Sequence, residues 1–453
     1  DACLHRRRFK AVQKVFPSTG MQLTDTLDTP ELVRYIGTGM GVRDVCRFSA
    51  ASRVANTVTR DVTSERAHDK HLIVFDGERS FALFDPRADQ WTSLPQLAAK
   101  RIGATLVPFT GRVYVCGGRQ LHLYHPYEDV SIASCLKVLE GSWDQLHDMT
   151  DDHTFAVGAC LQGHVYVCGG AYIDDVNGRS LYGPNPYDFR NLAGKESVDR
   201  FDPKTGCWCP TMPPMSIGRY HAVGVALNGC MYVCGGMSSN LTPLDSMEMF
   251  DPFLCQWKSL PQMLRCFVAP SRHEHVHFHK VSGFSFGADA SCIAGCLYIC
   301  GPSDYASGGS DFTVDRFDPA AGIWTELPAM KTRRCSSIAL ATCNDILYVF
   351  GGCEAESYPQ RESNIWLNSV ERYDPTLGEW EESPSSVVKG EDMKWPIAAS
   401  AGDRLYVSGS CSSSMGVFNL KANRWQTLPA MPLKIADAGG KEATVRSLTT
   451  AMT

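Results

Sequence analysis

A short apolar run that ends in two glycines recurs along this chain, and this repetition restricts the possible fold more than any other feature. Three copies are nearly identical: VYVCGG at Val113–Gly118, VYVCGG at Val165–Gly170 and MYVCGG at Met231–Gly236. Looser copies are LIVFDG at Leu72–Gly77, LYICGP at Leu297–Pro302, LYVFGG at Leu347–Gly352 and LYVSGS at Leu405–Ser410. Ordered copies of one segment indicate repeated structural units, so we expect seven of them.

Each copy is followed by an aromatic residue, usually before Asp-Pro, and then by a tryptophan. The aromatic residues are Phe84, Tyr124 (in Tyr-His-Pro), Phe201, Phe250, Phe317, Tyr373 and Phe418, and the tryptophans are Trp91, Trp143, Trp208, Trp257, Trp324, Trp380 and Trp425. In six of the seven units the two are seven residues apart. Pro and Asp favour turns, and paired glycines permit a tight turn, so each unit reads as four short strands. The first of the four is a small-residue strand such as Ala222–Leu227.

This pattern resembles the kelch repeat, over a region from Lys70 to about Met431. The resemblance implies an all-β domain, a seven-bladed kelch β-propeller over residues 67–453, with one radial sheet per blade. The first unit lacks an obvious innermost strand. We expect the tail after Pro432, for instance Ala443–Leu448, to supply that strand and close the ring.

The cysteines predict packing rather than chemistry. Cys116, Cys168, Cys234 and Cys300 share one repeat position, which Phe350 fills in another copy, and a site that accepts Cys or Phe is a packing site. The chain has 19 cysteines in 453 residues, an odd number, many of them within strand-like runs. We therefore expect free thiols and a reducing compartment, cytoplasmic and/or nuclear.

Composition narrows the function classes further. A formal net charge of −6 gives no argument for a nucleic-acid partner. The sequence contains no run of 18 or more apolar residues, so we expect no transmembrane helix, and no signal peptide is visible.

The N-terminal residues do not fit the repeat. Residues 1–20 read as a basic arm or helix, and residues 21–66 as a small α-helical module that resembles an F-box. The resemblance is carried by Pro30–Leu32, Ile36, Met40, Arg43–Ser49 and Ala51–Arg53. The sequence departs from the F-box pattern at Asp28-Thr29, where the family has Leu-Pro, and at Ala55, where it has a bulky aromatic residue.

An F-box docks to the Skp-type adaptor of a cullin–RING ubiquitin ligase. The resemblance implies adaptor contacts by Pro30, Leu32, Ile36, Met40, Val45 and Phe48. The alternative is a helical cap that packs on the propeller.

Insertions indicate which face of a propeller binds. Loops from strand two to three, and from strand four to the next blade, emerge on one face because the strands alternate in direction. The insertions 171–196, 265–290 and 353–368 fall on that face, and we place one insertion, 127–141, on the other. Loops on a rigid scaffold carry function, and Arg, Tyr and Trp are enriched at binding hot spots.

Kelch propellers of ligase receptors use this face, with arginines that grip acidic peptides. We predict substrate contacts by Arg101, Arg219, Tyr220, Arg265, Arg333, Arg334 and Tyr358. The alternative is that these arginines bond neighbouring loop carbonyls.

One segment resembles an enzyme motif. His273–His277 reads H-E-x-x-H, which binds zinc only when it is helical, whereas the histidines here alternate from His273 to His279 as in a strand. Such a row could catch a metal ion adventitiously. We predict no catalytic residue, metal or cofactor.

Together, these resemblances predict the substrate-recognition subunit of an SCF-type ubiquitin ligase. It would hold a protein substrate close to the conjugating enzyme and catalyse no reaction itself. The second reading is a kelch interaction scaffold, cytoskeletal or signalling, without a role in ubiquitin transfer. The third is a metal-dependent enzyme.

Overall fold

The chain divides into two units, Asp1–Asp69 and Lys70–Thr453. The computed structural model describes residues 70–76, 79–120, 128–173, 192–209, 211–239, 242–266, 289–302, 312–354, 365–388, 393, 396–409, 414–432 and 447–452. All of these lie in the second unit. The predicted F-box-like module, with Pro30, Leu32, Ile36, Met40, Val45 and Phe48, lies outside the described residues.

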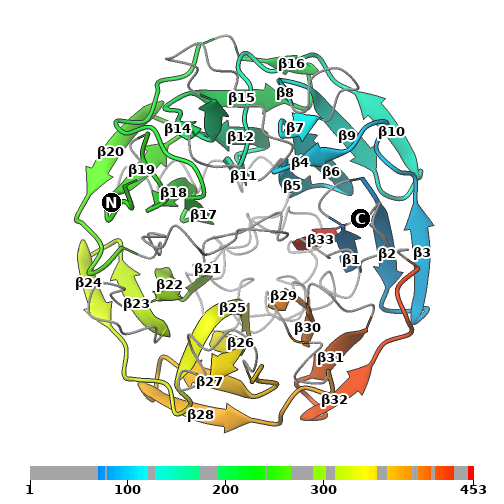
Figure 1. The fold of residues 1–453 in the computed structure, drawn as a ribbon, viewed down its shortest axis with the longest axis vertical. Helices are drawn as coiled ribbons and strands as arrows, with labels where there is room; N and C mark the ends of the chain where they lie inside the picture. Colours follow the sequence, from blue (N-terminus) through cyan, green and yellow to red (C-terminus); the bar gives the residue numbers. More distant parts are fainter. Residues whose placement is uncertain are drawn as a thin grey trace, which may run out of the picture. The chain divides into compact units, whose positions relative to one another are not determined.

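Seven four-stranded antiparallel sheets are arranged radially around an axis, as Figure 1 shows. The described residues therefore form an all-β, seven-bladed propeller without an α-helix. No helix in this part of the chain is long and apolar enough to cross a membrane. The predicted fold class is confirmed for the propeller.

The strands of each blade are given from the innermost to the outermost. Blade 1 is β33 (Ser447–Met452), β1 (Lys70–Phe75), β2 (Phe81–Asp85) and β3 (Gln90–Leu94). Blade 2 is β5 (Thr105–Phe109), β6 (Arg112–Cys116), β9 (Ala133–Lys137) and β10 (Ser142–Gln145). Blade 3 is β11 (Val157–Leu161), β12 (His164–Cys168), β15 (Val198–Asp202) and β16 (Cys207–Trp208). Blade 4 is β17 (Val223–Leu227), β18 (Cys230–Cys234), β19 (Met247–Asp251) and β20 (Gln256–Leu260).

The remaining blades follow the same order. Blade 5 is β21 (Asp289–Ile293), β22 (Cys296–Pro302), β23 (Phe312–Asp318) and β24 (Ile323–Glu326). Blade 6 is β25 (Arg334–Cys343), β26 (Ile346–Glu354), β27 (Val370–Asp374) and β28 (Glu379–Ser383). Blade 7 is β29 (Pro396–Ala401), β30 (Arg404–Gly409), β31 (Met415–Asn419) and β32 (Arg424–Thr427).

The ring closes through the end of the chain. Strand β33 pairs antiparallel with β1, from Lys70↔Met452 to Phe75↔Ser447, so the first blade takes its innermost strand from the C-terminal tail. The strand lies slightly later than the 443–448 segment suggested by the sequence. Closure of this kind removes the exposed edge that the first and last blades would otherwise present.

The aromatic–tryptophan spacing is a cross-strand pair. Phe250 on β19 lies opposite Trp257 on β20, with the ring centroids 5.1 Å apart. In blade 2 the residue opposite Trp143 is Leu136, so the assignment of Tyr124 to this position is wrong. The third strand of that blade starts at Ala133, and the seven-residue spacing holds in all seven blades. A leucine fills the aromatic position there, which concealed the repeat.

The tryptophans also join neighbouring blades. The indole nitrogen of each one donates a hydrogen bond to a backbone carbonyl of the preceding blade. The acceptor is a proline that follows the fourth strand, such as Pro213 for Trp257 at 2.9 Å, except that Trp208 bonds to His147. The tryptophan of one blade and a backbone carbonyl after the fourth strand of the preceding blade thus form one contact between blades.

Small residues line the centre because adjacent blades converge there. A Cβ atom on Gly224 of β17 would lie 1.8 Å from a methyl carbon of Val157 on β11. Further out, large side chains fill the space between sheets, as where Tyr232 and Met247 of blade 4 pack against Leu297 and Phe317 of blade 5.

The repeated cysteines belong to this core. All four repeated cysteines are buried and form no disulfide: Cys116, Cys168, Cys234 and Cys300. Phe350 at the same position is also buried, so the packing interpretation is confirmed. Burial raises the pKa of the Cys116 and Cys234 thiols to about 12. They are therefore protonated and poor nucleophiles at neutral pH.

Candidate protein-binding face

The two faces of the propeller differ in the length of their connections. One face carries the turns from first to second and from third to fourth strands. These turns are short, such as Asn228-Gly229 between β17 and β18, where both residues have positive φ. We call this the short-turn face. The other carries the connections from second to third strands and between blades, and we call it the long-loop face.

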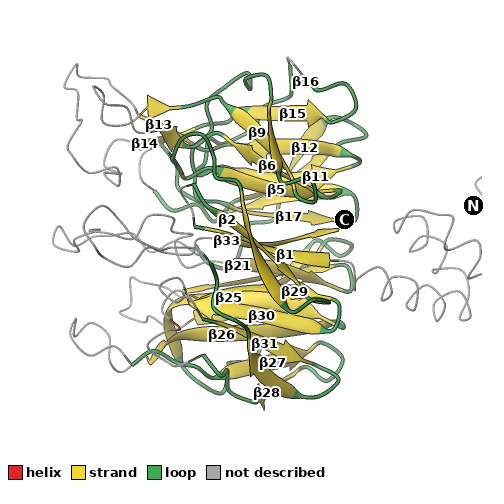
Figure 2. Ribbon diagram, turned by 90° about the vertical axis from the view of Figure 1, so that its right-hand side faces the viewer, coloured by secondary structure: helices red, strands yellow, loops and turns green. Residues whose placement is uncertain are grey.

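Among the described residues, strands beyond the four of each blade occur only on the long-loop face. β13 (Ala171–Ile173) pairs with β14 (Leu192–Gly194), and this hairpin projects at the left of Figure 2. β4 (Arg101–Ile102), β7 (Arg119–Gln120) and β8 (Glu128–Asp129) form a second small sheet. It follows that the placement of the 127–141 insertion on the opposite face is wrong. The inserted chain runs from β6 to β9, and the turn from β9 to β10 is short.

Buried side chains fasten the long loops to the sheets. Arg219 ends the connection that leads into blade 4, and its Nη1 donates to the carbonyl oxygens of Gly235 (2.8 Å) and Ser246 (3.1 Å). Its Nη2 donates to Glu248 Oε1 at 2.7 Å. In blade 6, Arg334 repeats this set with Gly351, Ser369 and Glu371. In blade 2, Arg101 bonds to Ile132 and to the hydroxyl of Ser134. We call Arg101, Arg219 and Arg334 the anchoring cations.

The acceptors include a set of carboxylates that the sequence analysis missed. Blades 3 to 6 place an acidic residue on the third strand, two residues before the aromatic: Asp199, Glu248, Asp315 and Glu371, all buried. Each also fixes backbone or a cation of the preceding loop: Glu371, for example, accepts from the amides of Lys331 (2.7 Å) and Thr332 (3.1 Å). An acid at a fixed repeat position inside an apolar strand is the signal that could have revealed them, because a buried charge requires a partner.

Three of the predicted substrate arginines are therefore occupied inside their own blades. Arg101, Arg219 and Arg334 are buried, which supports the alternative that they bond loop carbonyls. Tyr220 is also buried, and burial raises the pKa of its hydroxyl to about 12.

The other predicted substrate residues differ in position. Arg265 is half-buried and bridges Asp315 (3.1 Å) and Glu326 (2.9 Å). Burial raises the pKa of the Asp315 carboxyl to about 6 although Arg265 opposes this shift. Arg333 is exposed, next to the buried Arg334. Tyr358 lies outside the described residues.

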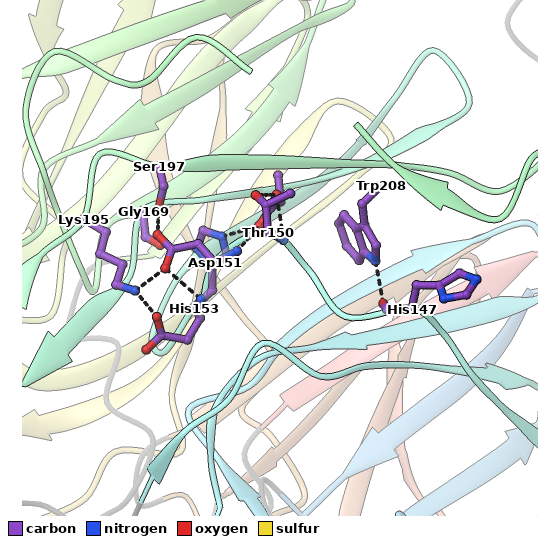
Figure 3. Close-up of polar contacts among 10 residues, drawn as sticks. His147, Thr150, Asp151, His153, Gly169, Lys195, Ser197 and Trp208 are labelled. Atoms are coloured by element: carbon purple, nitrogen blue, oxygen red, sulfur yellow. Dashed lines mark hydrogen bonds and ion pairs between the residues drawn. The ribbon is translucent and has the colours of Figure 1, made fainter. Parts of the chain in front are cut away.

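Blade 3 departs from the pattern in a way that Figure 3 shows. The residue at the anchoring position is His153, which contacts Gly169 and Asp199. Beside it, the ammonium group of Lys195 bonds to Asp151 (2.6 Å) and to Asp152, and Ser197 donates to Asp151 at 2.6 Å. Lys195 also lies 5.6 Å from the ring centre of Tyr172 on β13. These contacts attach the β13–β14 hairpin to the loop before blade 3.

Exposed apolar side chains occur on both faces. Ile217 and Leu264 project from connections between blades on the long-loop face, and Phe253 and Leu377 from turns on the short-turn face. The His273–His279 row lies outside the described residues. Within those that are described, no group of three His, Cys, Asp or Glu side chains is arranged to hold a metal ion.

Comparison with known proteins identifies the repeat. The Kelch motif matches residues 218–264 and 334–386, which cover blades 4 and 6. The propeller contains kelch repeats. The human Kelch-like protein 23 is 25% identical to the chain over 300 residues, which are 60% of this chain and 48% of that protein. Kelch repeat and BTB domain-containing protein 12 of Danio rerio is 25% identical over 297 residues, 63% of this chain and 34% of that protein.

Two further proteins also match parts of the chain. Beta-scruin of Limulus polyphemus is 26% identical over 208 residues, 42% of this chain and 21% of that protein. The solved structure of YjhT covers 74% of this chain and 99% of its own, at 14% identity and a TM-score of 0.47. The chain spans less than half the length of Kelch-like protein 23 and of the Danio rerio protein.

Proposed function

We propose that the kelch propeller binds a protein partner on its long-loop face. The observation that carries this proposal is that the extra strands β4, β7, β8, β13 and β14 all lie in connections of this face, whereas the turns of the other face are short. The anchoring cations and buried carboxylates hold the bases of these loops, so the loops are presented by a rigid scaffold. A rigid base reduces the conformational freedom that is lost on binding, which favours recognition of a partner. The kelch-like relatives support a binding role rather than catalysis.

Side chains that contact a partner must be exposed at the surface of the propeller. The buried arginines supply structure, and the face offers Tyr172, Ile217 and Leu264 together with the exposed Arg333. Arg265, which keeps about one sixth of its side chain exposed, stays in this set of predicted substrate contacts.

Substitutions on the two faces test the proposal with matched controls. Ile217→Asp and Leu264→Asp alter the long-loop face, and Phe253→Asp and Leu377→Asp alter the short-turn face. All four side chains are exposed, so the variants should fold equally well. We expect the first pair to weaken binding of a partner recovered by cross-linking and then purified, and the second pair to leave the dissociation constant unchanged. Loss of binding only in the second pair would refute the proposal.

The finer function that we propose is the substrate-recognition subunit of an SCF-type ubiquitin ligase. It rests on the F-box resemblance of residues 21–66, with the propeller as the substrate-binding part. A pull-down with purified Skp-type adaptor tests it, with Val45→Asp/Phe48→Asp as the variant. Binding by the parent that the variant loses supports the ligase role. Absence of binding by the folded parent leaves a kelch interaction scaffold, and the location in cytoplasm or nucleus stays a proposal in both cases.

A further inference from the structure

His153 occupies a position that an arginine fills in blades 2, 4 and 6. In blades 4 and 6 the anchoring arginine joins the carbonyl of the first glycine of the pair to the buried carboxylate of the third strand. In blade 3 the imidazole joins the equivalent groups, Gly169 and Asp199. An arginine keeps its charge at any pH of interest, whereas an imidazole does not.

Both ring nitrogens of His153 face hydrogen-bond acceptors. Nδ1 lies 2.5 Å from the carbonyl oxygen of Gly169, and Nε2 lies 3.0 Å from Asp199 Oδ2. A neutral imidazole has a single N–H, so it can satisfy only one of the two. The carboxylate of Asp199 also accepts hydrogen bonds from the amides of Thr150 (3.3 Å) and Asp151 (3.2 Å). Hydrogen bonds to both acceptors therefore require a proton on each ring nitrogen.

Acidic side chains outnumber basic ones around this pair. Asp199 projects from β15, and Asp151, Asp152 and Lys195 form the adjoining group, which gives three negative charges against one positive charge. Asp199 also interacts with two buried thiols, Cys168 on β12 and Cys116 on β6. Burial, followed by the Asp199 charge, raises the pKa of Cys168. Burial raises the pKa of Cys116, and Asp199 adds to this. Both thiols are therefore uncharged at neutral pH and add no charge beside the pair.

The backbone of His153 connects two blades. Its carbonyl oxygen accepts a hydrogen bond of 2.7 Å from Gly118, the second glycine of the blade 2 pair. Two residues later, Phe155 donates to Gly103 (2.8 Å) and accepts from His221 (3.0 Å). Displacement of the imidazole would therefore loosen the loop 150–155 and its contacts with blades 2 and 4.

We propose that His153 makes the attachment of the loop 150–155 to blade 3 dependent on pH, at a place where blades 2, 4 and 6 use a permanent cation. With both ring nitrogens protonated, the loop is fixed to Gly169 and Asp199. When the ring loses a proton, one acceptor faces a lone pair and the loop opens locally. This loop lies on the long-loop face, but the proposal concerns the free protein and does not require a partner.

Hydrogen exchange of the full chain between about pH 5 and 8, the range in which imidazoles usually titrate, tests the proposal. The amides of Thr150, Asp151 and Phe155 are followed in the parent protein and in His153→Arg, which restores the usual cation. Comparison at equal pH removes the intrinsic pH dependence of exchange. The loop 215–221, fixed by Arg219, is the internal control.

We expect exchange of the loop 150–155 in the parent to exceed that of His153→Arg by about tenfold at the upper end of the range, and to match it at the lower end. One charge-assisted hydrogen bond is worth roughly that factor. The loop 215–221 should show no such difference. Equal pH profiles in the parent and the variant would overturn the proposal.

A second measurement applies if His153→Arg fails to fold. ¹⁵N chemical shifts of the His153 ring in the parent report its protonation directly. Loss of one ring proton within the range, together with faster exchange in the loop 150–155, supports the proposal. A ring that is neutral throughout, or doubly protonated throughout, excludes it.

Discussion

The indole nitrogen of Trp91 donates a hydrogen bond of 2.8 Å to the carbonyl oxygen of Pro429, 338 residues further along the chain. This bond joins blade 1 to blade 7. An equivalent indole–carbonyl bond joins each of the other six pairs of neighbouring blades. The ring is thus closed twice at one junction, once by this contact and once by the pairing of β33 with β1. Residues at the two ends of the propeller sequence are adjacent in the folded ring.

Removal of residues 447–453 should destabilise the whole propeller rather than one blade. The deletion removes β33 and exposes the hydrogen-bonding edge of β1, which includes the buried Leu72 and Val74. We expect a lower unfolding temperature and concentration-dependent aggregation, measured by calorimetry and light scattering. Deletion of Thr453 alone, which lies beyond β33, is the control and should be neutral. Unchanged melting of the longer deletion would show that closure adds no stability.

The buried pair Arg334–Glu371 should contribute far more than an exposed pair in the same blade. Arg334→Met leaves the Glu371 carboxylate buried without its cation, and such losses cost about 3–5 kcal/mol. Arg372→Met breaks the half-exposed pair with Glu381, which is worth about 0–1 kcal/mol. Urea unfolding of the two variants measures the difference.

A double variant extends this test. Arg334→Met combined with Glu371→Leu removes both charges, so its loss of stability should be smaller than the sum of the single losses. Simple additivity would mean that the pair is not coupled.

Thiol reactivity should divide the cysteines by their place in the repeat. Cys207, Cys255 and Cys266 are exposed in the folded protein, and Cys116, Cys168, Cys234 and Cys300 are buried. A brief exposure to a maleimide, followed by peptide mass spectrometry, should label the first set and leave the second unlabelled. The second set should react after denaturation. Rapid labelling of Cys234 in the native protein would contradict the assignment of this position to the core.

Asp289 should make stability fall as the pH rises from about 4 to about 6. Burial raises the pKa of this carboxyl to about 6, and hydrogen bonds from Leu340 and Ala290 only partly oppose the shift. The folded state therefore binds the proton more tightly than the unfolded state, whose carboxyl has a pKa of about 3.9. The stabilisation is fully present below that value and is lost as the pH rises through about 6, a change of about 3 kcal/mol.

Asp289→Asn isolates this titration, because the asparagine does not ionise. The free energy of unfolding of the parent, relative to that of the variant, should decline over this range and then stay constant. A difference that does not vary with pH would rule out a buried, titrating carboxyl at this position.

The sequence by itself determined the architecture. Glycine pairs, the aromatic–tryptophan spacing and the buried cysteine position recur along the chain, and each is a local requirement of strand, turn or core. Such requirements can be read from one chain because every blade meets the same constraints. The prediction of the aromatic position was wrong only in blade 2, where the apolar side chain of Leu136 takes the place that an aromatic ring has in the other blades.

Only the tertiary structure decided what the polar residues do. An arginine before a strand looks the same in sequence whether it faces a partner or a buried carboxylate. The outcome depends on which groups another strand brings within hydrogen-bond distance, as Glu248 is brought to Arg219 and Asp199 to His153. The exact bounds and register of β33 were also decided there, because they depend on a pairing across nearly the whole length of the propeller. Local pattern specifies strands and turns, whereas burial and charge pairing are properties of the assembled ring.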